Sequence, residues 1–184
     1  MKIDKLFNGL KRIANGDYVL EGDLISEETI EIDLDDRFVV KGKIWAKKSI
    51  VVRCGIEAGD GIEAGDGIKA GDGIEAGCGI EAGDGIEAGD GIEAGWGIKA
   101  GDGIEAGDGI KAGWGIKAGW GIKAGCGIEA GAFISVKKRI FAGISIYRTS
   151  KDCDKTIRCT ELRDGEVCYG DLILTGSEEK PDED

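Results

Sequence analysis

Residues 55–90 read GIEAGDGIEAGDGIKAGDGIEAGCGIEAGDGIEAGD, and this phrase decides how the rest of the chain is interpreted. Thirteen copies of G-I-[EK]-A-G start at every sixth residue and run without insertion to Gly131, separated by Asp, Cys or Trp. A period of six residues with one large aliphatic side chain is typical of a β-solenoid. Each copy predicts a short strand and a corner, and three copies predict one triangular coil of 18 residues.

The side chains of each copy divide into an inner and an outer set. Successive side chains of a strand point to opposite faces, so we expect Ile and Ala inside and Glu or Lys outside. The corner is then Gly-X-Gly, where glycine permits the positive φ of a sharp turn. Stacked buried carboxylates would cost several kcal/mol each, so X (Asp, Cys or Trp) is expected to point outward.

The repeat resembles the hexapeptide β-helix families, strictly over residues 54–131 and loosely over 37–146. It is also similar to the bactofilins, in which G-[DN]-I-x-A units recur, and that resemblance implies a self-assembling structural protein. The segments NGDYVLEGDLI, GIEAG and IRCTELRDGEVCYGDL together resemble hexapeptide proteins of phages and prophages. All of these resemblances imply a parallel β-helix.

The expected fold class is an all-β triangular parallel β-helix with a short N-terminal amphipathic helix. Residues 1–16 include KIDKLFNGLKRIA, whose apolar residues have helical spacing, and we expect a helix that caps the solenoid or makes a homodimer contact. Residues 17–53 should form irregular first coils, 54–131 the regular β-helix, and 132–176 the last coils, a loop at TSKDCDKTIRC and a closing strand. Residues 177–184 are expected to be a disordered acidic tail.

Composition excludes several function classes. The net charge is −12, which argues against direct binding of nucleic acid. The six cysteines occur with no signal peptide and no long apolar segment, so we expect free thiols in the cytoplasm and no membrane contact. Cys153, Cys159 and Cys168 do not have the close-paired spacing of a zinc site, and no metal or cofactor is expected.

Enzymatic activity is not expected either. Left-handed hexapeptide helices are often acyltransferases, and the resemblance would imply a histidine base and loops between the coils. The chain has no histidine, and the array has no loop. Calcium could bridge the Asp columns, but each corner offers a single carboxylate per rung, so a solvated acidic surface is favoured. Ice binding would need threonine ladders, which the array lacks.

Folding the array by 18 residues places outward side chains in vertical columns about 4.8 Å apart. Residues 54–95 hold five Asp, six Glu and one Lys, whereas residues 96–131 are neutral and hold three Trp. The candidate acidic binding residues are Glu57, Glu75, Glu93, Asp72, Asp90, Glu63, Glu81, Asp66 and Asp84. The candidate Trp/Lys patch is Trp96, Trp114, Trp120, Lys99 and Lys117.

Two functions remain open from the sequence. The first is a non-enzymatic protein that mimics nucleic acid and blocks a basic nucleic-acid-binding protein, with Trp side chains as anchors. The phage resemblance implies that such a partner could be a host defence nuclease. The alternative is the self-assembling structural protein that the bactofilin resemblance implies.

Overall fold

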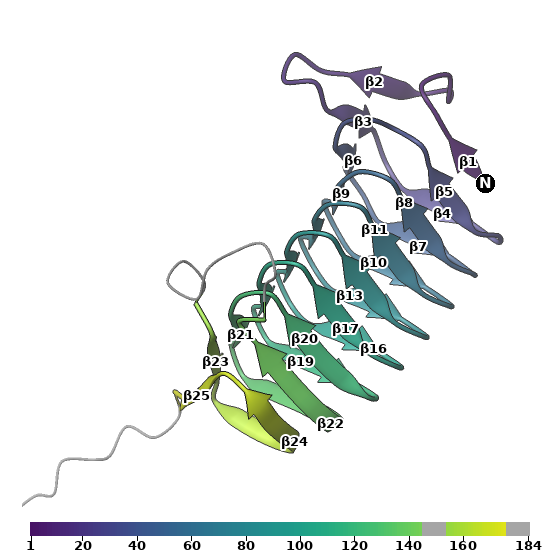
Figure 1. Cartoon of the computed structure of the whole chain (residues 1–184). Helices are drawn as coiled ribbons and strands as arrows, with labels where there is room; N and C mark the ends of the chain where they lie inside the picture. Colours follow the sequence, from purple (N-terminus) through teal and green to yellow (C-terminus); the bar gives the residue numbers. More distant parts are fainter. Residues whose placement is uncertain (145–153, 176–184) are drawn as a thin grey trace, which may run out of the picture.

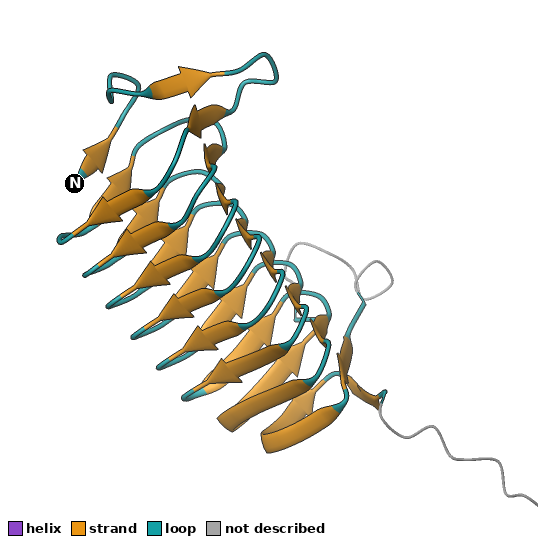
Figure 2. Ribbon diagram, turned by 180° about the vertical axis from the view of Figure 1, so that it is seen from behind, coloured by secondary structure: helices purple, strands orange, loops and turns teal. Residues whose placement is uncertain are grey.

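The computed structural model describes residues 1–144 and 154–175, and these residues contain strands, turns and no helix (Figures 1 and 2). The strands stack coil upon coil along one axis, from the N-terminal coils drawn in purple to the last strands in yellow (Figure 1). The prediction of an all-β solenoid is therefore confirmed. Nothing in the described chain qualifies as a membrane-crossing helix.

Three parallel ladders form the three faces of the solenoid. Face 1 consists of β3 (Tyr18–Leu20), β6 (Phe38–Val40), β9 (Ile56–Ala58), β12 (Ile74–Ala76), β15 (Ile92–Ala94), β18 (Ile110–Ala112), β21 (Ile128–Ala130), β23 (Thr156–Cys159) and β25 (Asp171–Leu174). Face 2 consists of β4 (Leu24–Ser26), β7 (Ile44–Ala46), β10 (Ile62–Ala64), β13 (Ile80–Ala82), β16 (Ile98–Ala100) and β19 (Gly115–Ala118). Face 3 consists of β5 (Ile30–Ile32), β8 (Ile50–Val52), β11 (Ile68–Ala70), β14 (Ile86–Ala88), β17 (Ile104–Ala106) and β20 (Gly121–Ala124).

Two long strands form the last rungs of faces 2 and 3 at the C-terminal end. β22 (Phe133–Ala142) pairs first with β19 and then with β20, so one strand turns the corner between the two faces. β24 (Glu161–Tyr169) pairs along β22 in the same way, with irregularities in register. The corners are named by the faces they join: corner 1–2, corner 2–3 and corner 3–1.

The register confirms the 18-residue coil. Ile62 pairs with Ile80, and Ile80 pairs with Ile98. The first coil is longer, because Tyr18 pairs with Phe38, an offset of 20 residues. From Phe38 the offset to Ile56 is 18 residues, and it keeps that value through the array.

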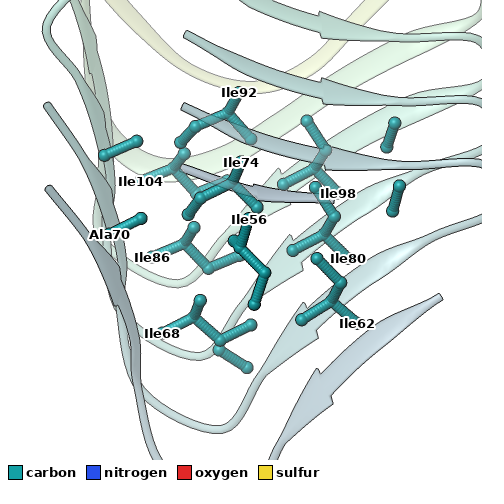
Figure 3. Packing of buried hydrophobic residues seen from close by; sticks show 14 of the residues in the cluster. Ile56, Ile62, Ile68, Ala70, Ile74, Ile80, Ile86, Ile92, Ile98 and Ile104 are labelled. Carbon is teal, nitrogen blue, oxygen red and sulfur yellow. The ribbon is translucent and has the colours of Figure 1, made fainter. Parts of the chain in front are cut away.

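The core consists of isoleucine and alanine stacks. The Ile and the Ala of every array strand are buried, and the Glu or Lys between them points outward. Figure 3 shows successive isoleucines stacked from coil to coil, for example Ile56, Ile74 and Ile92 of face 1. Each fully buried Ile contributes roughly 1.5–3 kcal/mol relative to an exposed one, which is the main term that offsets the charge repulsion outside.

The array glycines have a different role from the one expected. No array glycine has a positive φ; within the described residues, such angles occur only at Gly9, Gly16, Gly22, Gly143, Gly165 and Gly170. The reason for glycine is the close approach of stacked backbones. A Cβ built on Gly83 would lie 1.9 Å from the carbonyl oxygen of Gly65, one coil below.

The predicted N-terminal helix is wrong. Residues 1–16 contain two short strands: β1 (Lys2–Ile3), parallel to β5, and β2 (Leu10–Arg12), antiparallel to β3. The open edges of β3 and β5 need backbone partners, and an isolated helix of this length is marginal in water. Gly9, with φ of 86°, lies just before β2. Because the helix is absent, the predicted homodimer contact through it no longer applies.

The same residues nevertheless cover the N-terminal end of the core. Ile3 is fully buried, and Phe7 and Leu10 pack against the core cluster. Lys5 and the Tyr18 hydroxyl both donate hydrogen bonds to the Asp35 carboxylate. These bonds, led by the one from Lys5, lower the pKa of Asp35 to about 2.

The C-terminal end is open within the described residues. Leu172 and Leu174 continue the interior columns of Ile157 and Cys159, yet they are 39% and 47% exposed. The predicted loop TSKDCDKTIRC is wrong at its end, because Thr156–Cys159 forms β23. The rest of that segment up to Cys153, and the predicted acidic tail 177–184, lie outside the described residues.

Candidate functional site

The corner residue X points outward in most of the array, as expected. Trp96, Trp114 and Trp120 are 68%, 60% and 60% exposed. The prediction is wrong at Cys54 and Cys126, which are 3% and 9% exposed. A thiol tolerates such burial because it behaves as a small apolar group, whereas a carboxylate would not.

Burial changes the chemistry of these thiols. It raises the pKa of Cys54 to about 11, and burial also raises the pKa of Cys159. Cys78 occupies the same repeat position as Cys54 but is exposed. The thiolate is the reactive form, so equivalent positions should differ in reactivity.

We expect iodoacetamide at about pH 8 to alkylate Cys78 at least about tenfold faster than Cys54, because Cys54 is both covered and protonated. Peptide mapping by mass spectrometry over time measures both rates in one sample. The raised pKa favours the neutral thiol in the fold, so the stability it contributes is present below the unfolded pKa of about 9 and is lost as pH rises toward 11. After unfolding, the two cysteines should be alkylated at equal rates. Equal rates already in the native protein would contradict the burial of Cys54.

Backbone hydrogen bonds align the corner residues in columns. At corner 2–3 the amide of Asp84 donates to the carbonyl of Asp66, at 3.2 Å, and the amide of Asp102 donates to that of Asp84, at 3.1 Å. Trp120 and Lys138 continue this column. At corner 3–1 the aspartates Asp72, Asp90 and Asp108 are aligned in the same manner between the two buried cysteines.

Face 3 lies between these two aspartate columns. Its own outward column is Lys69, Glu87, Glu105 and Lys123, and it is internally neutralised. Lys69 lies 2.8 Å from a Glu87 oxygen, and Lys123 pairs with Glu105. The net charge of face 3 in the array therefore comes from the aspartates at its two edges.

We call the two edges of face 3 the Asp rows: Asp66, Asp84 and Asp102 at corner 2–3, and Asp72, Asp90 and Asp108 at corner 3–1. The first five of these, Asp108 apart, make no ion pair within the described residues. Two carboxylates per coil of about 4.8 Å give one charge per about 2.4 Å of axis. Double-stranded DNA has one per about 1.7 Å, also arranged in two rows.

Face 1 holds three of the predicted acidic residues, but cations compensate them. Arg37 pairs with both Glu57, at 2.9 Å, and Glu75. Glu93 lies 3.7 Å from Lys111. A groove on this face is lined by Glu75 and Glu93 together with Asp72 and Asp90 of the neighbouring Asp row.

Face 2 holds the whole predicted Trp/Lys patch. Trp96 and Trp114 lie on corner 1–2 and Trp120 lies on corner 2–3, so the tryptophans border the face on both sides. Lys99 and Lys117 lie between them in the outward column, in the coils that follow those of Glu63 and Glu81. A groove lined by Trp45, Trp114, Phe133 and these four charged residues follows the column.

The nine predicted acidic residues are thus divided over three sides and cannot all face one rigid surface. Sequence reasoning missed Asp102 and Asp108, because summing charge over halves of the array assigned them to the neutral half. The 18-residue columns already contained the signal that would have included them. It also missed Arg37, which neutralises Glu57 and Glu75 from an irregular coil.

Comparisons with known proteins add no family assignment. No protein-family model, curated protein or solved structure matches the chain. Within residues 1–144 and 154–175, no group of three or more Cys, Asp or Glu side chains is arranged to hold a metal ion.

Proposed function

We propose that the protein is a non-enzymatic binding protein whose face 3 takes the place of a nucleic-acid backbone on a basic, nucleic-acid-binding partner. The observation that supports this most directly is the pair of Asp rows. They run along both edges of one face, while the column between them is neutralised by its own lysines. A partner that grips two phosphate rows would meet two rows of carboxylates.

Electrostatics would dominate such a complex. Aligned like charges create a field that steers a cationic partner and raises the association rate. The same interaction is screened by salt, because the Debye length is about 10 Å at 0.1 M and about 3 Å at 1 M. Binding is therefore expected to be fast and strongly salt-dependent.

Trp120 supplies an apolar anchor at the end of one Asp row. It follows Asp102 in the corner 2–3 column, and its ring is 60% exposed. The Lys138 ammonium lies 3.8 Å from the ring centroid, which holds the indole beside a cation. Exposed tryptophans are enriched among residues that dominate binding energy.

The resemblance to phage hexapeptide proteins extends the proposal to the identity of the partner. A host nuclease that protects against phage DNA has the basic groove that this face would fill. On that reading the protein is an inhibitor of host defence.

Neutralising one Asp row tests the proposal. The variant Asp66→Asn/Asp84→Asn/Asp102→Asn removes three charges from exposed positions that make no ion pair. The assay measures the concentration that displaces a fluorescent DNA duplex from basic DNA-binding proteins and nucleases. We expect this concentration to be at least about tenfold higher for the variant than for the wild type, equivalent to a loss of about 1.4 kcal/mol in binding free energy. Fluorescence anisotropy measures the displacement, and about 500 mM salt should abolish it.

A matched control is Glu21→Gln/Asp60→Asn/Glu129→Gln, which removes the same charge from exposed positions outside the Asp rows. It should displace the duplex as the wild type does. Failure of the wild type to displace duplex from any of these proteins, or equal losses in both triple variants, would overturn the proposal.

A second candidate function is favoured by the C-terminal end of the solenoid, which is open as far as residues 1–144 and 154–175 show. Leu172, Ile173 and Leu174 are all exposed on β25, which is the edge strand of its sheet within the described residues, and an edge strand can pair with another chain. This is the self-assembly that the bactofilin resemblance implies. Light scattering over a range of protein concentrations should then show species larger than a dimer, and Leu174→Glu should remove them; a discrete small species in both proteins would eliminate this candidate.

A further inference from the structure

The outward column of face 2 has an ordered charge sequence. From the N-terminal side it reads Glu63, Glu81, Lys99, Lys117, with each residue in direct register with the next. Two negative charges are thus followed by two positive charges at the coil spacing of about 4.8 Å. Reversing the direction of this column gives its electrostatic complement.

The other two faces lack this property. The face 3 column, Lys69, Glu87, Glu105 and Lys123, is unchanged in charge by reversal, so two antiparallel copies with their column centres aligned would put like charges together. Reversing the face 1 column, Glu57, Glu75, Glu93, Lys111 and Glu129, about its centre also places Glu57 opposite Glu129 and Glu93 opposite Glu93. With the centres of the array columns aligned, face 2 is therefore the face that is complementary to its own reversal.

The ion pairs within the chain leave the ends of this column unused. Lys99 bonds to Glu81 in the centre. Glu63 and Lys117, three coils apart, make no ion pair within the described residues. A second copy in the opposite direction would place its Lys117 over Glu63 and its Glu63 over Lys117.

We propose that face 2 is a homodimer surface on which two copies pack antiparallel, about a twofold axis that passes between Glu81 and Lys99. An isologous contact of this kind closes after two copies and does not grow into a filament. A parallel arrangement would place Glu63 on Glu63 and Lys117 on Lys117, which the charges disfavour.

The corner 1–2 side chains fit the same alignment. The twofold axis brings Trp96 over Cys78 of the second copy, and sulfur–aromatic contacts are favourable. It brings Trp114 over Asp60 of the second copy, where the indole N–H can donate to a carboxylate. The two exposed rings, 68% and 60% exposed, would be covered.

Corner 2–3 opposes the contact, since Asp84 would approach Asp102 of the second copy. These side chains lie at the rim, where solvent screens them, so we expect the copies to pack closest along corner 1–2. The six strands of face 2 and β22 make seven rungs at about 4.8 Å, and six residues per side at about 3.3 Å give a face of roughly 34 by 20 Å. The area of this face is slightly below the roughly 800 Å² per partner of a standard interface. We therefore expect a weak dimer with a dissociation constant in the micromolar range.

Charge reversal at the two unpaired positions tests the proposal. Sedimentation velocity from about 5 to about 500 µM should show the wild type passing from monomer to a discrete dimer that weakens with salt. Glu63→Lys and Lys117→Glu should each remain monomeric over this range, with a dimer dissociation constant at least about tenfold higher than that of the wild type. Both variants should behave in this way although they change the net charge in opposite directions. Circular dichroism checks that both are folded.

The decisive arm is recovery of the dimer. Mixing the two single variants should restore a heterodimer, because Lys at 63 of one copy then faces Glu at 117 of the other, while the second contact keeps the native Lys117 and Glu63. The double variant Glu63→Lys/Lys117→Glu should also dimerise. A wild type that is monomeric at about 500 µM, single variants that dimerise normally, or species larger than a dimer would overturn the proposal. The readout is self-association alone, so it stands or falls independently of any nucleic-acid-binding partner.

Discussion

Gly83→Ala is expected to destabilise the protein by about 3 kcal/mol or more, although the change adds one methyl group. The added Cβ would lie 1.9 Å from the carbonyl oxygen of Gly65 and 2.9 Å from its carbonyl carbon. Both are backbone atoms, so no side chain can rotate away. The coils must separate locally, which breaks hydrogen bonds such as that from the Gly83 amide to Ala64, at 3.1 Å.

Gly85→Ala is the matched control, two residues away in the same corner. Its Cβ would lie 3.3 Å from the carbonyl oxygen of Gly103, a tight contact that a small shift relieves. Neither glycine has a positive φ, so alanine also restricts the unfolded chain, which favours folding by about 0.4–1 kcal/mol. The free energies of unfolding of the two variants, measured by urea unfolding, should therefore differ by at least about 2 kcal/mol. Equal stabilities would mean that the corner relaxes, as the glycine-free corner at Lys47-Lys48-Ser49 shows is possible elsewhere in this solenoid.

Ile92→Ala is expected to cost about 2–5 kcal/mol. Ile92 is 1% exposed and is stacked between Ile74 and Ile110 in the face 1 ladder. The backbone hydrogen bonds above and below it fix the coil spacing, so the cavity left by three carbons cannot close by sliding the coils together. The melting temperature should fall by about 4–20 °C for a chain of this size.

Glu93→Ala controls for the loss of side-chain atoms on the same strand. Glu93 points outward, and its contact with Lys111 at 3.7 Å joins two exposed side chains. Such pairs contribute about 0–1 kcal/mol, so the variant should melt within a few degrees of the wild type. If Ile92→Ala behaved like Glu93→Ala, the isoleucine stacks would not be the main source of stability.

The N-terminal region shows where periodicity misleads. The spacing of Ile3, Phe7 and Leu10 fits one face of a helix, but it also fits two short strands joined by a turn at Gly9. Local pattern cannot separate these alternatives, because the choice depends on the unpaired edges of β3 and β5, which lie elsewhere in the sequence. The cap is therefore made by sheet pairing.

The charged surface likewise combines a feature that the sequence predicts with one that depends on contacts between coils. The 18-residue columns follow directly from the repeat, since every copy has the same length and the same buried positions. Which carboxylates stay unpaired does not follow from the columns alone. It depends on lysines one coil away, such as Lys69 beside Glu87, and on Arg37 from an irregular coil.

The sequence by itself determined the solenoid, its 18-residue coil, the Ile and Ala core and the membership of each column, because a strict period of six leaves one way to bury every isoleucine. Only the tertiary structure decided why the corners need glycine, which corner cysteines are covered, how the ends are made and which faces carry uncompensated charge. Each of those features depends on the distance between atoms one coil or more apart, and a distance across coils is a property of the stacked backbone that no single repeat contains.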